Sequence, residues 1–360
     1  MKAILDLDTG IDDALALAYA IAHPDLELIG VTCTYGNVTV PLAVRNTLAL
    51  LELLGKGDIP VFAGPSPDGF RPSDISSFIH GRNGVGEVLL PPATGQVQSQ
   101  PAAEFLLQAV HEHGADLVII PTGPSTTIAA AMRQDPSFAA NAHLVMMGGA
   151  LTVPGNVTPW SEANISQDPE ATDYLFRHTS DTTMVGLDVT LRTLLTTAES
   201  ARWRAAGTRA GRIFADMVDY YIRAYATTSP HLGGCGLHDP LAAAVAADAT
   251  LVDVLSINLK TDTTGPTRGR TIADETRLDA PPTARVAVGV DSERFVREFV
   301  GRLEALFSEL QKHSLEAVCF DFLCLGAVRC LFGLATAVHS SCGTHKSRAQ
   351  RRLKRHDNVD

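Results

Sequence analysis

The fold is decided near the start of the chain, by the stretch Ala3-Ile4-Leu5-Asp6-Leu7-Asp8-Thr9-Gly10-Ile11-Asp12-Asp13. Its first part, Ala3–Leu7, is a short apolar run that predicts a buried β-strand. The segment Asp13–Ala22 is rich in alanine and leucine and predicts an α-helix, which Pro24 ends. A buried strand that leads within a few residues into a helix is the repeating unit of α/β proteins.

The same alternation of strand and helix continues to about residue 190. Further strands are predicted over Leu28–Thr34, Ile59–Ala63, Asp116–Ile120, His143–Met147 and Thr183–Leu187, and helices over Pro41–Leu54, Ala102–His113 and Ser125–Met132. This spacing predicts an α/β fold with an open, mostly parallel sheet that is flanked by helices. Beyond residue 195 the pattern becomes largely helical, which predicts a helical elaboration in the C-terminal half. The helices and strands expected there are Thr197–Ala206, Ala210–Tyr225, Asp239–Ala247, Leu251–Leu259, Ala284–Gly289 and Ser292–Leu310.

Charged residues are unevenly distributed along the 360-residue chain. The net charge is −11, yet residues 311–360 hold 8 Lys/Arg against 4 Asp/Glu, so residues 1–310 carry −15. An acidic body of this kind argues against a nucleic-acid partner held by phosphate contacts. Four of the six cysteines also lie in residues 311–360. We therefore predict one domain over residues 1–310 and an atypical, basic, Cys-containing tail of unknown role over 311–360.

Cysteine usage and hydropathy predict a cytoplasmic protein that does not enter a membrane. Six cysteines without any CxxC motif do not make a disulfide framework, which favours a reducing compartment. The apolar start of the chain is broken by Asp6 and Asp8, unlike a signal peptide. The other apolar run, Ala317–Val338, is interrupted by Asp321 and Arg329, whose charges oppose insertion into a bilayer.

Polar residues follow several of the predicted strands directly. Asp8, Asn37, Thr122 and Gly148 each stand at or just after a strand end. In open α/β sheets, ligands bind outside the carboxyl ends of the strands. The sequence therefore predicts one crevice that is lined by several loops.

The densest chemical signal is the set of four carboxylates Asp6, Asp8, Asp12 and Asp13 within eight residues. Unpaired like charges this close repel one another, and a hard divalent cation would relieve the repulsion. Ca²⁺ accepts six to eight oxygen ligands in irregular geometry, whereas Mg²⁺ requires a nearly octahedral site. The alternative is that Asp12 and Asp13 only complement the amino end of the following helix.

Two further stretches carry polar groups with two interpretations each. In His238-Asp239-Pro240, Asp239 suits a helix N-cap, but the pair also offers a proton donor and a metal ligand. In the stretch Gly155–Asn164, the side chains of Asn156, Glu162 and Asn164 suit the hydroxyl groups of a sugar. Turn chemistry explains such a stretch equally well.

Seven motifs together carry a family resemblance. They are Asp8-Thr9-Gly10-Ile11-Asp12-Asp13, Tyr35-Gly36-Asn37, His80-Gly81, Pro121-Thr122-Gly123-Pro124, Met147-Gly148-Gly149, the Asn156/Glu162/Asn164 loop with Asp168-Pro169-Glu170-Ala171, and His238-Asp239-Pro240-Leu241-Ala242. In these motifs and their order, the chain resembles the nucleoside hydrolases of the inosine-uridine-preferring type over about residues 1–310. The resemblance implies a nucleoside hydrolase-like catalytic domain, hydrolysis of ribonucleosides to ribose and free base, and a homodimer or homotetramer.

The resemblance also implies a role for each matching residue. Ca²⁺ would be held by the carboxylates of Asp8, Asp13 and Asp239 and by the backbone carbonyl of Thr122. Asp8 and His238 would be the catalytic residues, Asp8 as acceptor of a proton from the attacking water. The substrate would be bound by Asp12, Asn37, His80, Met147, Asn156, Glu162 and Asn164.

These residue types suit the reaction. Cleavage of an N-glycosidic bond passes through an oxocarbenium-like sugar, which carboxylates stabilise. A metal lowers the pKa of its water, and histidine titrates in the range needed to protonate a leaving base. Water that attacks opposite the base would invert the configuration at C1′.

Two other functions are open to the same residues. A phosphohydrolase would use Asp6-Leu7-Asp8 as an Asp-x-Asp nucleophile motif with Mg²⁺, although Gly10 stands where that motif usually has Thr or Val. A nucleoside- or ribose-binding protein without catalysis would use the sugar-binding loop alone.

Overall fold

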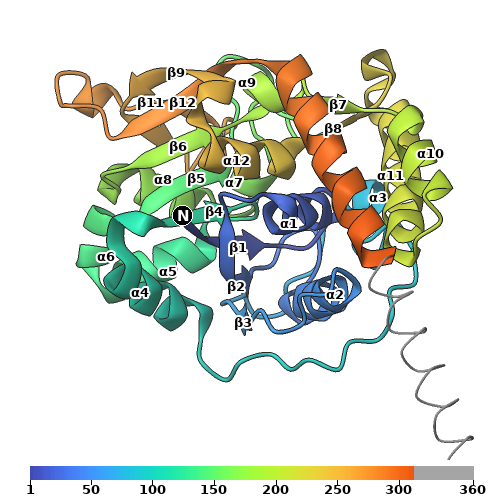
Figure 1. Cartoon of the computed structure of the whole chain (residues 1–360). Helices are drawn as coiled ribbons and strands as arrows, with labels where there is room; N and C mark the ends of the chain where they lie inside the picture. The colour runs from blue at the N-terminus through green and yellow to red at the C-terminus, as the bar shows by residue number, and fades with distance from the viewer. Residues whose placement is uncertain (312–360) are drawn as a thin grey trace, which may run out of the picture. The chain divides into compact units, whose positions relative to one another are not determined.

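A mostly parallel sheet of eight strands forms the centre of the computed structural model, which describes residues 1–311 (Figure 1). Its strand order is β3-β2-β1-β4-β5-β6-β12-β9. All neighbours are parallel except β9, which runs antiparallel to β12. The strands are β1 (Lys2–Leu7), β2 (Glu27–Cys33), β3 (Val61–Ala63), β4 (Leu117–Pro121), β5 (His143–Met147), β6 (Thr182–Val185), β9 (Val252–Ile257) and β12 (Ala284–Val290). The predicted α/β fold with an open sheet is confirmed.

Helices lie on both sides of this sheet (Figure 1). One layer contains α4 (Ala102–His113), α5 (Thr126–Gln134), α6 (Pro136–Asn141) and α8 (Pro169–His178), which pack on one another over a continuous apolar core. The other layer contains α1 (Ile11–Ala22), α2 (Val40–Leu53), α12 (His238–Ala247) and a helix over residues 292–311. Both layers consist largely of helices that the sequence pattern predicts.

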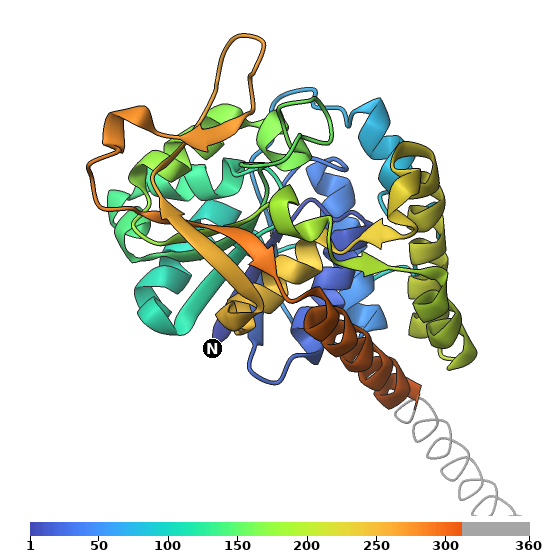
Figure 2. The same ribbon diagram turned by 90° about the horizontal axis from the view of Figure 1, so that it is seen from above.

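The helical elaboration consists of α10 (Thr197–Ala205) and α11 (Arg209–Thr228), which pack side by side. Figure 2 shows this pair, in yellow-green, standing apart from the central sheet. Helix α11 also contacts α3 (Asp74–His80), and the turn η2 (Pro230–Leu232) follows it. These elements lie next to the carboxyl ends of the strands and form part of the wall of the site described below.

Helix α1 begins at Ile11, within the aspartate stretch. Gly10 is its N-cap, and the Gly10 N–H donates to Asp13 Oδ2 at 2.6 Å. The helix is then buried on nearly all sides, since it packs on α12 and against the helix over residues 292–311. Tyr19 makes the latter contact, with ring centroids 5.8 Å from Phe299 and 6.4 Å from Phe295. An alanine- and leucine-rich sequence suits a helix that has no solvated face.

Short elements are the ones that the sequence pattern does not predict. They are α3, α6, α7 (Ala163–Gln167), α8, α9 (Leu187–Thr190) and two antiparallel pairs, β7 (Leu194–Leu195) with β8 (Cys235–Gly236) and β10 (Leu259–Thr261) with β11 (Thr271–Ala273). Most span too few residues to show a helical or strand period. Helix α8 is longer, but Pro169 at its start and its polar side chains resemble a loop.

No helix within residues 1–311 is both long enough and apolar enough to cross a membrane. Residues Met1–Ser308 form one unit by their internal contacts. The apolar run Ala317–Val338 and nearly all of the tail predicted over 311–360 lie outside the described residues.

A buried ion-pair cluster at Asp274 gives a prediction for acid stability. Asp274 Oδ2 accepts hydrogen bonds from Arg277 at 2.8 Å and Arg177 at 2.9 Å, and Oδ1 accepts from the Thr276 hydroxyl at 2.7 Å. Burial opposes the charged form, but these bonds lower the pKa of Asp274 to about 2 from 3.8. Stability from this carboxylate is therefore complete above pH 4 and is lost as the pH falls towards 2.

We expect Asp274→Asn to lower the free energy of unfolding at pH 7 by about 2 kcal/mol. The difference in free energy of unfolding between the variant and the wild type should shrink as the pH falls from 4 to 2, because the wild-type carboxylate becomes protonated over this range. Urea denaturation at several pH values measures it, with the exposed Asp25→Asn as control. A difference that stays constant down to pH 2 would contradict the assignment.

Candidate active site

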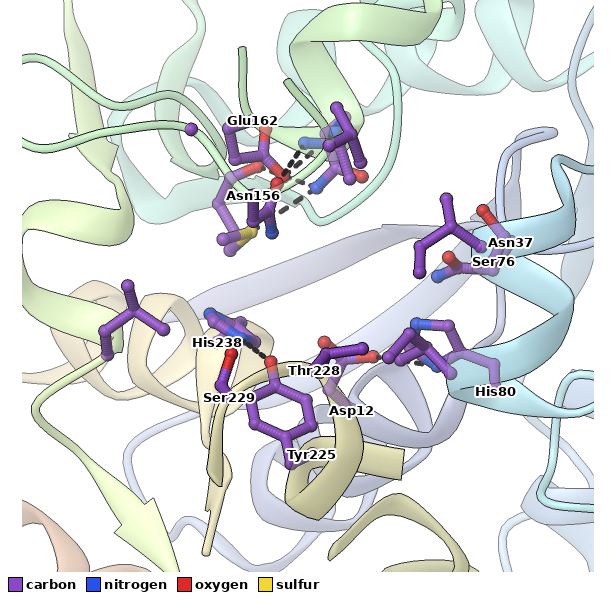
Figure 3. Close-up of a pocket in the computed structure, with 18 of the residues that line it drawn as sticks. Asp12, Asn37, Ser76, His80, Asn156, Glu162, Tyr225, Thr228, Ser229 and His238 are labelled. Carbon is purple, nitrogen blue, oxygen red and sulfur yellow. Dashed lines mark hydrogen bonds and ion pairs between the residues drawn. The ribbon is translucent and has the colours of Figure 1, made fainter. Parts of the chain in front are cut away.

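A cavity of about 480 Å³ opens at the carboxyl ends of the parallel strands. Ten of the twelve residues predicted for the site line it: Asp12, Asn37, His80, Thr122, Met147, Asn156, Glu162, Asn164, His238 and Asp239. Figure 3 shows Glu162 and Asn156 on one side of this cavity, facing His238 and Asp12 on the other. Residues more than two hundred positions apart, such as Asp12 and Asp239, thus meet in one crevice, as the strand ends predict.

The remaining two residues, Asp8 and Asp13, lie directly behind this lining. Asp8 Oδ2 accepts the backbone N–H of Asn37 at 2.6 Å, and Asp13 Oδ1 accepts the hydroxyl of Thr122 at 2.7 Å. Both carboxylates are completely buried. They therefore form the floor beneath the lining residues Asn37 and Thr122.

Three carboxylates of the site form a group that could hold a metal ion. Oxygen atoms of Asp12, Asp13 and Asp239 lie within 4.8 Å of one another, and all three side chains are buried. This group contains Asp12 where the expected ligand set had Asp8. Burial, followed by repulsion from Asp12, raises the pKa of Asp13 to about 7 and that of Asp239 well above its usual range. Positive charge at this point would favour the ionised forms of both carboxyls.

Two carboxylate oxygens of the site, Asp8 Oδ1 and Asp12 Oδ1, are buried without a hydrogen-bond partner among the described residues. Burial and repulsion from Asp13 raise the pKa of Asp8 well above its usual range. Buried unpaired carboxylate oxygens are costly unless a ligand satisfies them. An all-oxygen donor set of this kind fits a hard divalent cation.

Asp239 and Asp13 differ in whether they cap the helices in whose first turn they lie. Helix α12 begins at His238 with Leu237 as N-cap, so the prediction that Asp239 caps the helix is wrong. Asp239 lies in the first turn, and its carboxylate belongs to the metal-binding group. Asp13 does take part in capping α1, because it accepts the Gly10 N–H. Its other oxygen still accepts from Thr122.

The loop with Glu162 forms a rigid opposite wall. The Glu162 carboxylate accepts backbone N–H groups of Asn164 at 2.9 Å, Gly149 at 3.0 Å and Ile165 at 3.2 Å. Burial outweighs these bonds and raises the pKa of Glu162 to about 7. Asn156 Oδ1 accepts the backbone N–H of Ala163 at 3.0 Å. Hydrogen bonds thus fix both side chains beside the cavity.

Asn164 connects this wall with the aspartate group. Its Nδ2 atom donates to the backbone carbonyl oxygen of Thr122 at 2.8 Å and to that of Met147 at 3.2 Å. The Thr122 carbonyl, an expected metal ligand, is therefore held in place by a residue expected to bind the sugar.

The histidines lie on the side of the cavity away from Glu162. His238 is bonded at both ring nitrogens, with Nε2 2.6 Å from the hydroxyl of Tyr225 and Nδ1 2.7 Å from that of Thr190. His80 Nδ1 accepts the backbone N–H of Ile11 at 3.2 Å, which places the proton of the neutral ring on Nε2. Burial lowers the pKa of both imidazoles.

Tyr221 and Tyr225 are site residues for which the sequence leaves two interpretations, core packing and the lining of a base pocket. Both are buried, but they also line the cavity from α11. The Tyr221 hydroxyl donates to Asp12 Oδ2 at 3.2 Å, and Tyr225 bonds to His238. Their spacing of four residues on one helix was the available signal, since it places two polar ring tips on one face.

Other cavity residues come from elements that the sequence pattern does not predict. Ile75, Ser76 and Ile79 of the short helix α3 line the mouth, together with Leu191 and His231. Trp160, within the stretch Gly155–Asn164, is not among the described lining residues. Its exposed ring packs instead against the guanidinium of Arg270, 5.2 Å from the ring centroid.

The phosphohydrolase alternative places its nucleophile at Asp6, which the structure puts inside the sheet. Asp6 is completely buried, accepts the hydroxyl of Thr32 at 2.6 Å, and does not line the cavity. A nucleophile must reach its substrate, and Asp6 lies within strand β1, whereas Asp8 follows the strand end and bonds to the lining residue Asn37. The geometry therefore contradicts this use of the Asp-x-Asp motif.

Comparisons with known proteins agree with the geometry. The family profile described as "Inosine-uridine preferring nucleoside hydrolase" matches residues 3–297. "Probable uridine nucleosidase 2" of Arabidopsis thaliana is 34% identical over 313 residues, which are 84% of this chain and 97% of that protein. "Pyrimidine-specific ribonucleoside hydrolase RihA" of Salmonella arizonae is 34% identical over 84% of this chain and 98% of its own.

A solved structure is more similar still. "Purine-Preferring Ribonucleoside Hydrolase from Gardnerella vaginalis" superposes with a TM-score of 0.84 and 54% sequence identity, covering 86% of this chain and 99% of that one. On the evidence of site, profile and relatives, this chain belongs to the inosine-uridine preferring nucleoside hydrolase family and is an enzyme that hydrolyses ribonucleosides.

Proposed function

We propose that the enzyme depends on Ca²⁺ and that the cation is held by the carboxylates of Asp8, Asp13 and Asp239 and the carbonyl of Thr122. The observation that carries this proposal is the buried group of Asp12, Asp13 and Asp239, whose carboxylate oxygens lie within 4.8 Å of one another. Asp8 is a further buried carboxylate of the site, and its Oδ1 has no hydrogen-bond partner among the described residues. The donors are all oxygen atoms on irregular loops, which suits Ca²⁺ better than Mg²⁺. When bound, the cation would lower the pKa of the attacking water and align the ribose hydroxyls.

The ribose would lie between the aspartate group and the Glu162 loop. Asp12, Asn37 and Asn164 would bind its 2′- and 3′-hydroxyls, while Asn156 and Glu162 would bind the 5′-hydroxyl. Hydrogen bonds within the protein already fix Asp12 and Asn164, so little side-chain entropy is lost on binding. Ionised carboxylates on one face of the ring would stabilise the positive charge of the oxocarbenium-like transition state.

Asp8 would accept a proton from the attacking water. The Asn37 N–H fixes one oxygen of this carboxylate, and the other has no partner among the described residues. Attack from this face, opposite the base, would invert the configuration at C1′.

His238 would supply the proton to the leaving base. Because Thr190 and Tyr225 bond to its two nitrogens, the ring has one orientation. Tyr225, whose hydroxyl bonds to Nε2, also lines the cavity, so the proton would pass through this hydroxyl to the base. His80 and Met147 would contact the base and the sugar respectively.

We also propose a preference for purine nucleosides. The support is the 54% identity to a hydrolase that is named as purine-preferring, against 34% to relatives whose names specify uridine or pyrimidines. The apolar mouth formed by Ile75, Ile79 and Leu191, beside Tyr221, suits a two-ring base.

Steady-state kinetics on inosine, guanosine, adenosine, uridine and cytidine test the preference. We expect kcat/KM for at least one of the purine nucleosides to exceed that for uridine by about tenfold or more. Higher kcat/KM for uridine and cytidine than for all three purine nucleosides would contradict the preference while leaving the hydrolase assignment intact.

The remaining proposals concern location and assembly. A cytoplasmic protein is supported by Cys33 and Cys235, which are free, buried thiols in the described part of the chain. A homodimer or homotetramer is proposed on family resemblance alone.

A further inference from the structure

Residue 9, in the middle of the aspartate stretch, has a strained backbone. Thr9 has φ = +26°, a left-handed value that a β-branched residue rarely adopts. Within residues 1–311, Glu87 is the only other non-glycine residue with positive φ. Such conformations cost about 1–3 kcal/mol and persist only where the surroundings hold them.

A hydrogen bond to helix α2 holds Thr9 in this conformation. Thr9 Oγ1 lies 2.8 Å from Thr47 Oγ1, and both side chains are completely buried. The preceding residue of α2, Asn46, donates to the backbone carbonyl of Asn83 at 2.7 Å. One turn of α2 thus fixes both the aspartate stretch and the loop that follows His80.

The conformation of residue 9 sets the directions of the groups on either side of it. Before it, Asp8 Oδ2 accepts the Asn37 N–H. After it, the Gly10 N–H donates to Asp13 Oδ2 at 2.6 Å. If residue 9 relaxed to negative φ, the Asp8–Thr9 peptide would rotate relative to the segment that begins at Gly10, and the carboxylates of Asp8 and Asp13 would no longer be fixed relative to each other.

The surroundings leave no room for a compensating shift. A Cβ atom on Gly36 would lie 2.0 Å from Asp8 Oδ2, and one on Gly10 would lie 2.7 Å from His80 Nδ1. The backbone therefore approaches these side chains as closely as glycine allows. This close packing requires the backbone at residue 9 to keep its conformation.

We propose that Thr9 and Thr47 are positioning residues whose shared hydroxyl hydrogen bond keeps Asp8 and Asp13 directed at one cation. The proposal rests on the proposed Ca²⁺ site. Neither threonine is a ligand, and neither lines the cavity. Groups that orient metal ligands typically change metal affinity by 10- to 100-fold when removed, which is the size of effect expected here.

Ca²⁺ binding measured by calorimetry on metal-stripped protein tests this proposal. Thr9→Val and Thr47→Val each remove one hydroxyl while keeping the β-branched shape, and each should raise the Kd for Ca²⁺ about tenfold. Thr47→Val also removes a contact of the Thr47 hydroxyl with Cys33 Sγ at 3.5 Å. The double variant should therefore bind no more weakly than Thr47→Val alone, because the Thr9–Thr47 bond is already broken in it. If Thr47→Val does not fold, Thr9→Val tests the bond from its other end.

The chain offers a matched control at the amino end of another strand of the sheet. Thr182, at the start of β6, makes an equivalent buried bond of 2.8 Å to Thr179 Oγ1. Thr182→Val should leave the Kd for Ca²⁺ unchanged, and Thr47→Ser, which keeps the hydroxyl, should bind Ca²⁺ like wild type.

Two kinds of result overturn the positioning role. Wild-type affinity in both valine variants would show that the bond does not position the ligands. Equal weakening in Thr47→Ser or Thr182→Val would assign the effect to packing. Absence of Ca²⁺ binding in wild type is a different failure, because it would remove the proposed cation site itself.

Discussion

Asp8→Asn is expected to lower kcat for inosine about a thousandfold or more while the protein stays folded. Asparagine has the same shape and can still accept the Asn37 N–H, which Asp8 Oδ2 accepts at 2.6 Å. It cannot take a proton from water, and it removes one negative charge from the floor of the cavity. Steady-state release of ribose gives kcat, and circular dichroism reports the fold.

Asp274→Asn is the matched control for Asp8→Asn. It also replaces a buried, hydrogen-bonded carboxylate, but one outside the cavity. We expect it to lose stability and to keep wild-type kcat. An Asp8→Asn enzyme with kcat within tenfold of wild type would remove Asp8 from its role as base.

His238→Ala is expected to lower kcat for inosine about a hundredfold, because the leaving base then departs without a proton donor. The loss should depend on the leaving group. A nitrophenyl riboside, whose nitrophenolate leaves without protonation, should be hydrolysed at nearly the wild-type rate. The ratio of the two substrates therefore separates proton donation from a general disturbance of the site.

Tyr225 provides a further check on the same assignment. Its hydroxyl is 2.6 Å from His238 Nε2, so Tyr225→Phe should lower the rate on inosine and spare the nitrophenyl riboside. Equal loss on both substrates in His238→Ala would show that the histidine supports the site structurally and does not protonate the base.

The strand ends explain why so much of the site could be predicted. Buried parallel strands appear as continuous apolar runs, and each ends at the same edge of the sheet. Asp8, Asn37 and Thr122 follow three such runs and meet in space as expected. The α/β fold and this shared edge thus follow from local patterns.

Long-range side-chain contacts are what the sequence does not reveal. Tyr225 has the spacing of a core residue, and only its contact with His238 distinguishes it. Asp239 has the sequence of an N-cap, but the helix starts one residue earlier and frees its carboxylate. Thr9 has no sequence signature at all, since its backbone conformation is held by Thr47, 38 positions away.

The most direct test of the proposed chemistry is ribose release from inosine by the metal-stripped enzyme, before and after Ca²⁺ is added back. If the carboxylates of Asp8, Asp13 and Asp239 hold a catalytic cation, stripping should lower the rate by more than about a hundredfold, and Ca²⁺ should restore it. Full activity in protein shown by elemental analysis to contain no metal would contradict the account.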